Sequence, residues 1–172
     1  LNGLSNFLGK RIYIYMIHYV FDLDDTIILH VKGQAINYET IPADGELSAM
    51  LQRCKGPCYI YTNGTGGHAL DIIEKMNIYH DFDKIYSRDT IPYMKPDPRS
   101  FNDVQDDISF RDSSPKQIFF FDDLLENLQT AHDLGWITFW IHPQARGYMS
   151  HSFVNMGFIN IKECLSYLET KY

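Results

Sequence analysis

The stretch that decides the fold is IHYVFDLDDT, residues 17–26. Its first half is rich in β-branched and aromatic residues, which favour a strand buried on both faces. Its second half holds Asp22, Asp24 and Asp25 and closes with Thr26. Aspartate is disfavoured inside a strand and common in the turn that follows one. The stretch therefore predicts a buried strand that ends in a turn rich in carboxylates.

The remainder of the chain alternates strand-like and helix-like segments. Besides 17–21, strands are expected at 58–61, around 85–86, at 118–121 and at 136–141. Helices are expected from 44–46 onward, after 66–67, at about 98–108, from about 128 to 135, and at 161–168. The second helix carries the apolar residues Leu70, Ile73 and Met76. This alternation predicts an α/β fold, a single domain over residues 1–172, with five parallel strands between two layers of helices.

Composition limits the classes of function. Apolar residues make up 45% of the 172 residues and aromatic residues 15%, enough for a substantial core. The net charge of −7 argues against a general binder of membranes or nucleic acids, although a local basic pocket stays open. No apolar run approaches the roughly 20 residues that span a bilayer. Residues 1–15 lack a secretory signal pattern and are expected to be a dispensable extension, so a cytoplasmic protein is predicted.

Carboxylates follow two of the predicted strands. Asp22 and Asp24 come after the first strand, and Asp122 and Asp123 come after the strand at 118–121. Open parallel sheets bind ligands at the carboxyl ends of their strands. One aspartate at such a place is usually a turn or a helix cap, but crowded carboxylates repel one another and need a cation. Two clusters at corresponding strand ends therefore predict a Mg²⁺ site.

Three further polar residues suit a phosphate. Thr62 and Asn63 follow the second strand and can supply hydrogen-bond donors. Lys95 stands in a loop that prolines constrain, ahead of a helix. Taken singly, these are an ordinary turn and a solvated lysine. They gain meaning only together with the carboxylates.

In this order, these residues resemble the motifs of the haloacid dehalogenase (HAD) superfamily of phosphohydrolases. The four motifs are matched by Asp22, Asp24 and Thr26, by Thr62 with Asn63 after it, by Lys95, and by Asp122 with Asp123. The resemblance covers about residues 17–143 and implies a three-layer Rossmann-like core. The segment 119–138 also resembles the branch with pyrimidine nucleotidases and the phosphatase domain of soluble epoxide hydrolase.

The resemblance implies a role for each residue. Asp22 would be the nucleophile that forms an aspartyl-phosphate, and Asp24 would be the acid and then the base. Mg²⁺ would be held by the Asp22 carboxylate, the backbone carbonyl of Asp24 and Asp123, with Asp122 binding directly or through water. The phosphoryl oxygens would be held by Thr62, Asn63 and Lys95.

The spacing of the motifs leaves no room for a full cap domain. Only a flap at 28–42 is expected in addition to the core elements. An open site admits a small phosphorylated molecule or a phosphate exposed on a macromolecule, and the sequence leaves the oligomeric state open. This departs from the capped nucleotidases.

Several alternatives compete with the phosphatase. A dehalogenase generally lacks a second aspartate at the place of Asp24, and a phosphomutase would need a cap. A nucleotidase for nucleoside monophosphates and a non-catalytic binding module with the same fold stay open as alternatives. The binding module would not need Asp24 and Lys95 together.

Overall fold

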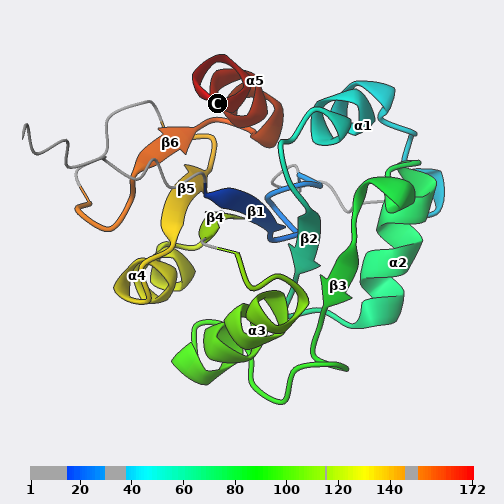
Figure 1. The fold of residues 1–172 in the computed structure, drawn as a ribbon. Helices are drawn as coiled ribbons and strands as arrows, with labels where there is room; N and C mark the ends of the chain where they lie inside the picture. The colour runs from blue at the N-terminus through cyan, green and yellow to red at the C-terminus, as the bar shows by residue number, and fades with distance from the viewer. Residues whose placement is uncertain (1–14, 30–37, 115, 146–150) are drawn as a thin grey trace, which may run out of the picture.

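The computed structural model describes residues 15–29, 38–114, 116–145 and 151–172 (Figure 1). Most of the predicted extension at 1–15 and the centre of the predicted flap at 28–42 therefore lie outside the described residues. The described part of the chain forms one sheet with helices on both of its faces. None of its helices is long and apolar enough to cross a membrane.

The sheet is parallel throughout, which confirms the predicted fold class. Its strands, in the described residues, are β1 (Met16–Phe21), β2 (Cys58–Tyr61), β3 (Lys84–Tyr86), β4 (Lys116–Asp122), β5 (Ile137–Ile141) and β6 (Met156–Phe158). Their order across the sheet is β3-β2-β1-β4-β5-β6. The chain first builds outward from β1 through β2 to β3 and then returns to place β4 on the other side of β1. The strand order thus reverses between β1 and β4, and this is where parallel sheets open a crevice for ligands.

The prediction of five strands is wrong, because Met156–Phe158 adds a sixth at one edge. Three residues with a glycine at the centre carry no strand signal of their own. Backbone hydrogen bonds to β5 and the residue after it hold this strand in place. Asn155 donates its backbone N–H to the carbonyl of Thr138 at 3.0 Å, and His142 donates its backbone N–H to the carbonyl of Phe158 at 3.0 Å. Tertiary pairing therefore makes a strand that the local sequence does not predict.

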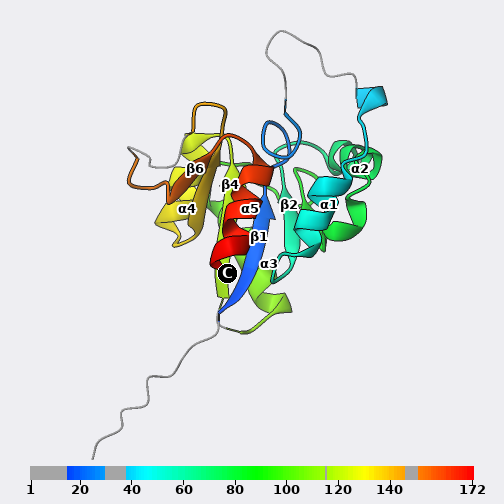
Figure 2. The same cartoon turned by 90° about the horizontal axis from the view of Figure 1, so that it is seen from above.

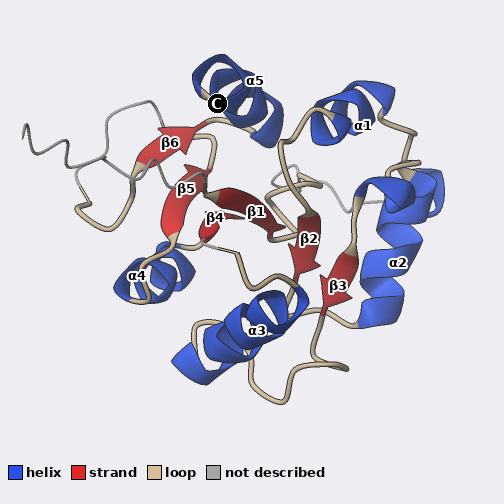
Figure 3. Ribbon diagram, in the orientation of Figure 1, coloured by secondary structure: helices blue, strands red, loops and turns tan. Residues whose placement is uncertain are grey.

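Two layers of helices cover the sheet (Figure 3). The helices are α1 (Gly45–Gln52), α2 (Gly66–Lys75), α3 (Pro98–Arg111), α4 (Leu125–Asp133) and α5 (Ile161–Lys171), with short 3-10 helices at Tyr38–Thr40 and Tyr79–Asp81. The buried residues of α1, α2 and α5 belong to one core cluster, and those of α3 and α4 belong to another. Seen from above, α1 and α5 lie next to each other on their face of the sheet (Figure 2).

Aromatic side chains fill both cores. On the face that α1, α2 and α5 cover, the ring of Phe121 stacks on Phe21 at 4.5 Å and on Phe139 at 5.0 Å between centroids. Phe120 points to the opposite face, as alternation along a strand requires, and meets Phe101 edge-on at 5.6 Å. The run of bulky residues in β4 is therefore buried on both sides, as predicted.

The second helix buries one stripe of its surface. Ala69, Ile72, Ile73 and the following Met76 are buried, whereas Leu70 is 36% exposed. The buried positions follow the spacing of one helical face, i, i+3, i+4 and i+7. Leu70 lies one residue away from that stripe, so of the three apolar residues singled out in the sequence only Ile73 and Met76 join the core.

Candidate active site

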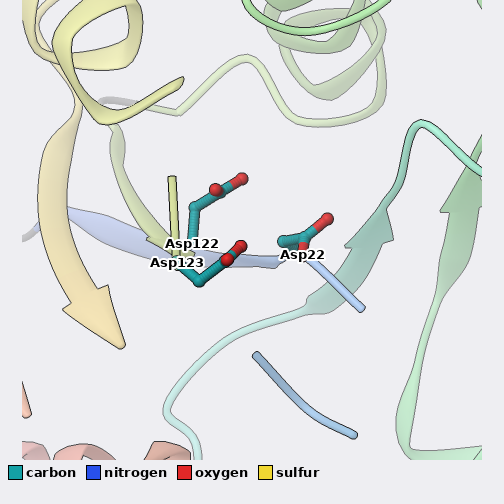
Figure 4. Close-up of side chains that lie close together, drawn as sticks. All are labelled: Asp22, Asp122 and Asp123. Atoms are coloured by element: carbon teal, nitrogen blue, oxygen red, sulfur yellow. The ribbon is translucent and has the colours of Figure 1, made fainter. Parts of the chain in front are cut away.

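Three carboxylates meet at the ends of β1 and β4. Phe21 pairs with Phe121 in register, so the residues that follow them emerge side by side. Asp22 donates its backbone N–H to the carbonyl of Phe121 at 2.9 Å, which fixes the start of its turn. Asp22, Asp122 and Asp123 each offer an oxygen, and these oxygens lie within 4.8 Å of one another (Figure 4). Such a group of hard oxygen donors can hold a metal ion.

A single buried ammonium joins this cluster. Lys95 is 5% exposed, so it is not the solvated lysine that its local sequence alone would suggest. Its Nζ donates to Asp22 Oδ1 at 2.7 Å, to Asp122 Oδ2 at 2.8 Å and to the carbonyl of Tyr61 at 2.8 Å. Among the described residues, no other cationic side chain forms an ion pair with the three carboxylates.

Burial and crowding shift the pKa values of this cluster. Burial raises the pKa of Asp22 to about 7, with Lys95 opposing the shift and Asp122 adding to it. Burial, with Asp122 nearby, raises the pKa of the Asp123 carboxyl to about 6. Burial on its own lowers the pKa of Lys95, but the carboxylates of Asp122 and Asp22 outweigh it and leave that pKa above its ordinary value. One positive charge is thus too little for three carboxylates.

Asp122 is fully buried and held by several donors. Its Oδ1 accepts from the backbone N–H of Leu124 at 2.8 Å, and the side-chain amide of Asn127 lies 3.0 Å from each oxygen. Together with Lys95, these contacts fix both oxygens of Asp122. Asp123, the next residue in the chain, is only half-buried.

The turn after β1 separates the carboxylates of Asp22 and Asp24. The carbonyl of Leu23 accepts from the N–H groups of Ile27 and Ile28 at 2.9 and 3.0 Å. Asp25 adopts a φ of 61°, in the left-handed region that aspartate tolerates better than most residues. The chain doubles back there, and Asp24 does not join the three-carboxylate cluster.

The Asp24 side chain instead meets a histidine from α2. His68 Nε2 lies 3.2 and 3.3 Å from the two carboxylate oxygens of Asp24. His68 belongs to the first turn of α2, and its backbone N–H is capped by the hydroxyl of Thr65 at 3.2 Å. The ring of Tyr38 meets the imidazole edge-on, with 5.3 Å between centroids.

The two predicted motif threonines are both buried. Thr62 donates its backbone N–H to the carbonyl of Tyr86 at 3.0 Å, and its hydroxyl oxygen accepts from the N–H of Gly64 at 2.9 Å. A hydroxyl that accepts still has its own hydrogen to donate. The hydroxyl of Thr26 is buried and has no hydrogen-bond partner among the described residues.

The side chain of Asn63 binds the backbone of Lys95. Its amide donates to the carbonyl of Lys95 at 2.9 Å, and its oxygen accepts from the N–H of Lys95 at 2.9 Å. Both polar ends of the side chain are therefore engaged with one residue. Arg88 in turn donates through Nε to the carbonyl of Asn63 at 2.7 Å.

The structure thus brings Asp22, Lys95, Asp122 and Asp123 together and ties Asn63 to Lys95. Sequence reasoning missed His68 as a contact of the site. A signal existed, because this residue lies in the first turn of the helix that follows the second strand, and the N-terminus of that helix faces the strand ends. The hydrogen bonds between Asn127 and Asp122 could not be predicted from the sequence around either residue.

Comparison with known families shows which family the chain belongs to. Residues 31–141, well over half of its length, match the family model for haloacid dehalogenase-like hydrolases. The chain belongs to this family. The match includes Thr62, Lys95 and the Asp122–Asp123 pair, and it begins after Asp22 and Asp24. No curated protein matches the chain.

Solved structures of haloacid dehalogenase-like proteins share the fold. The magnesium-bound HAD-hydrolase YfnB from Bacillus subtilis has a TM-score of 0.66 at 14% identity, over 90% of this chain and 99% of that chain. The haloacid dehalogenase-like protein SP0104 from Streptococcus pneumoniae has a TM-score of 0.59 at 13% identity, over 89% and 98%. The L-2-haloacid dehalogenase from Xanthobacter autotrophicus has a TM-score of 0.61 at 12% identity, and this chain spans 64% of it. Identities this low show a common fold.

Proposed function

We propose that this hydrolase is a Mg²⁺-dependent phosphomonoester hydrolase that works through an aspartyl-phosphate on Asp22. The observation that carries the proposal is the excess of negative charge in its buried cluster. The three carboxylates of Asp22, Asp122 and Asp123 have one ammonium beside them among the described residues, that of Lys95, which pairs with Asp22 and Asp122. A divalent cation would balance these charges, and the donors are carboxylates, which Mg²⁺ prefers.

The contacts suggest which carboxylates would bind the metal ion and which one would hold the site in shape. Asp122 is fixed by Lys95, Leu124 and Asn127, so we assign it to the support of the site. Asp22 and Asp123, with the backbone carbonyl of Asp24, would then hold the ion directly. When bound, Mg²⁺ would supply positive charge that offsets the repulsion between a carboxylate nucleophile and an anionic phosphate.

In the first step, a carboxylate oxygen of Asp22 attacks phosphorus and the bond to the ester oxygen breaks. The carboxylic acid of Asp24 gives its proton to that oxygen, so the product leaves as an alcohol. Asp22 must be ionised to attack; the ammonium of Lys95 favours that form, and bound Mg²⁺ would favour it further. The Asp24 carboxylate lies outside the three-carboxylate group and beside His68, which suits a group that acts on the leaving oxygen.

In the second step, the Asp24 carboxylate takes a proton from water, and the resulting hydroxide attacks the same phosphorus. The acyl-phosphate bond breaks, Asp22 leaves as a carboxylate, and inorganic phosphate is released. Asp24 is then protonated again, ready for another ester. The two steps together consume one ester and one water.

Lys95 and Thr62 are placed to hold the phosphoryl group. Lys95 Nζ lies 2.7 Å from Asp22 Oδ1, so a phosphoryl group joined to that carboxyl would lie beside the same ammonium. Thr62 can donate its hydroxyl hydrogen from the end of β2. Asn63 would act differently from the sequence prediction, by holding the backbone of Lys95 in place.

We also propose a site without a full cap domain. Between Asn63 and Lys95 the chain forms α2, a 3-10 helix and β3, all of which belong to the core. The flap expected at 28–42, whose centre lies outside the described residues, would then be the cover that this chain supplies. Phosphate esters of small molecules and phosphates on macromolecules both fit such a site, and a nucleoside monophosphate is one member of the first class.

The test is hydrolysis of p-nitrophenyl phosphate with Mg²⁺ and with EDTA, for wild type and Asp22→Asn. We expect turnover only with Mg²⁺ and a loss of at least about a thousandfold in the variant, because the nucleophile is gone. The control is His80→Ala, an exposed histidine in the 3-10 helix before β3, which should match wild type.

Three results would contradict the proposal. Equal activity in wild type and Asp22→Asn would remove the nucleophile from the mechanism. Chloride release from 2-chloropropionate, without phosphate release from any ester, would make the protein a dehalogenase. Absence of both activities, with tight binding of a protein partner, would favour the binding module.

A further inference from the structure

We infer that His68 is a positioning residue that holds the Asp24 carboxylate in the direction required for proton transfer. The inference rests on the proposed function, in which Asp24 is the acid and then the base. It concerns a residue outside the carboxylate and lysine cluster. Its basis is one contact between the turn after β1 and the helix after β2.

The contact has the geometry of a donor placed between two acceptors. His68 Nε2 lies 3.2 Å from Asp24 Oδ1 and 3.3 Å from Oδ2. A nitrogen shared in this way fixes the plane of the carboxyl group. Each oxygen keeps further lone-pair directions for the leaving group or the water.

The Asp24 side chain is partly exposed, so a hydrogen bond to a second element limits its rotation. Its side chain is 33% exposed and stands on a turn, where rotamers interconvert readily. A misplaced acid or base transfers its proton poorly, and an error of about 1 Å can lower the rate about a hundredfold. A partner from a second element reduces that freedom.

His68 is itself held by its surroundings. It stands in the first turn of α2, with its backbone N–H bonded to the Thr65 hydroxyl at 3.2 Å. The Tyr38 ring packs edge-on against the imidazole, with 5.3 Å between centroids. Gly64 leaves the space beside it: a Cβ there would lie 3.3 Å from His68 Cδ2 and 3.2 Å from Thr62 Oγ1. A helix-borne side chain packed in this way positions a partner better than a loop does.

The experiment compares His68→Ala, His68→Gln and His68→Asn on two substrates. Glutamine places its amide nitrogen near the position of Nε2, whereas the shorter asparagine does not reach it. For p-nitrophenyl phosphate the leaving phenolate needs little help from an acid, whereas for glycerol 2-phosphate the leaving alkoxide needs a proton. The first step is followed as kcat/KM, with Mg²⁺ present.

We expect His68→Ala to lower kcat/KM for glycerol 2-phosphate by about ten- to a hundredfold, and for the aryl ester by less than about threefold. His68→Gln should recover most of the alkyl activity, and His68→Asn should not. Thermal unfolding checks that each variant folds. If His68→Ala does not fold, the comparison of the two amides decides the question by itself.

An equal loss on both substrates, or a glutamine variant no better than the asparagine variant, would overturn the role of His68 and leave the proposed function standing. A wild-type protein that hydrolyses neither ester would overturn the proposed function and this inference together. Activity in His68→Ala equal to wild type on glycerol 2-phosphate would also overturn the inference.

Discussion

At the scale of single residues, Lys95 sets the electrostatics of the site. It gives hydrogen bonds to Asp22, to Asp122 and to the carbonyl of Tyr61, so each of its three hydrogens has an acceptor. A buried ammonium is stable only with such partners. Without a bound cation, the remaining negative charge is reduced when a carboxyl group takes up a proton.

The first prediction concerns the stability of the metal-free protein. Burial raises the pKa of Asp22 from 3.8 to about 7, so over this range the folded protein holds a proton that the unfolded chain has lost. The free energy of unfolding should therefore fall as the pH rises from about 4 to about 7. Saturating Mg²⁺ should oppose this fall, because the ion displaces the proton from Asp22 and binds more tightly as the pH rises.

Urea unfolding in EDTA and in Mg²⁺, at several pH values across this range, measures the effect. Asp22→Asn is the matched control, since an amide does not titrate. In that variant the free energy of unfolding should fall less with pH above about pH 6. Below about pH 6 it should still fall, because Asp123, whose pKa is raised to about 6, still titrates there. A wild-type curve unchanged by the substitution would show that Asp22 is not the titrating group.

Sequence reasoning was strongest for the residues at the strand ends. Asp22, Asp122 and Asp123 were expected to meet, and their oxygens lie within 4.8 Å. The burial of Lys95 was not visible locally, because it depends on a loop that folds back over β1 and β4. The side chain of Asn63 was expected to bind phosphate, yet it hydrogen-bonds to the backbone of Lys95.

At the scale of elements, two loops position the ammonium. The loop after β2 carries Asn63, and its side chain closes a pair of hydrogen bonds on the peptide of Lys95. The Lys95 loop is therefore fastened to the end of β2, in addition to its own turn, in which Asp97 donates its backbone N–H to the carbonyl of Met94 at 2.9 Å. This contact keeps the lysine within reach of Asp22.

Asn63→Ala should disconnect the two loops. We expect it to destabilise the protein by about 1–3 kcal/mol, because it leaves the N–H and the carbonyl of Lys95 without partners. It should also lower kcat about tenfold with little change in KM, since the ammonium loses its place in the transition state. Urea unfolding and steady-state kinetics on an aryl phosphate measure the two effects.

The matched control is Asn102→Ala, at an exposed position of α3, which should change stability by less than about 0.5 kcal/mol. A large rise in KM with kcat unchanged would contradict the positioning role. That result would instead return Asn63 to direct contact with the substrate.

Strand and helix patterns were predicted where periodicity is strong and missed where tertiary contacts decide. The prediction of β4 is confirmed, because its run of bulky apolar residues is buried most completely in a strand that helices cover on both faces. The edge strand β6 depends on pairing with β5, so it has no local signal. Leu70 shows the same limit, since spacing predicts a helix but does not fix which of two adjacent stripes is buried.

At the scale of the whole molecule, the fold admits more than one chemistry. Its structural neighbours include a magnesium-bound HAD-hydrolase and an L-2-haloacid dehalogenase, each below 25% identity. The choice between phosphate and haloacid therefore depends on particular residues. Under the proposed function, Asp24 and the carboxylate cluster around Lys95 favour phosphate.

The most direct measurement is to trap the covalent intermediate. Wild type is mixed with p-nitrophenyl phosphate and Mg²⁺, quenched in acid within the first turnovers, digested, and analysed by mass spectrometry. We predict that the peptide containing Asp22 gains the mass of one phosphoryl group, that EDTA prevents the gain, and that Asp22→Asn never shows it. A phosphoryl group on another residue, or hydrolysis without any labelled peptide in wild type under conditions that preserve acyl-phosphates, would contradict the assignment of Asp22 as the nucleophile.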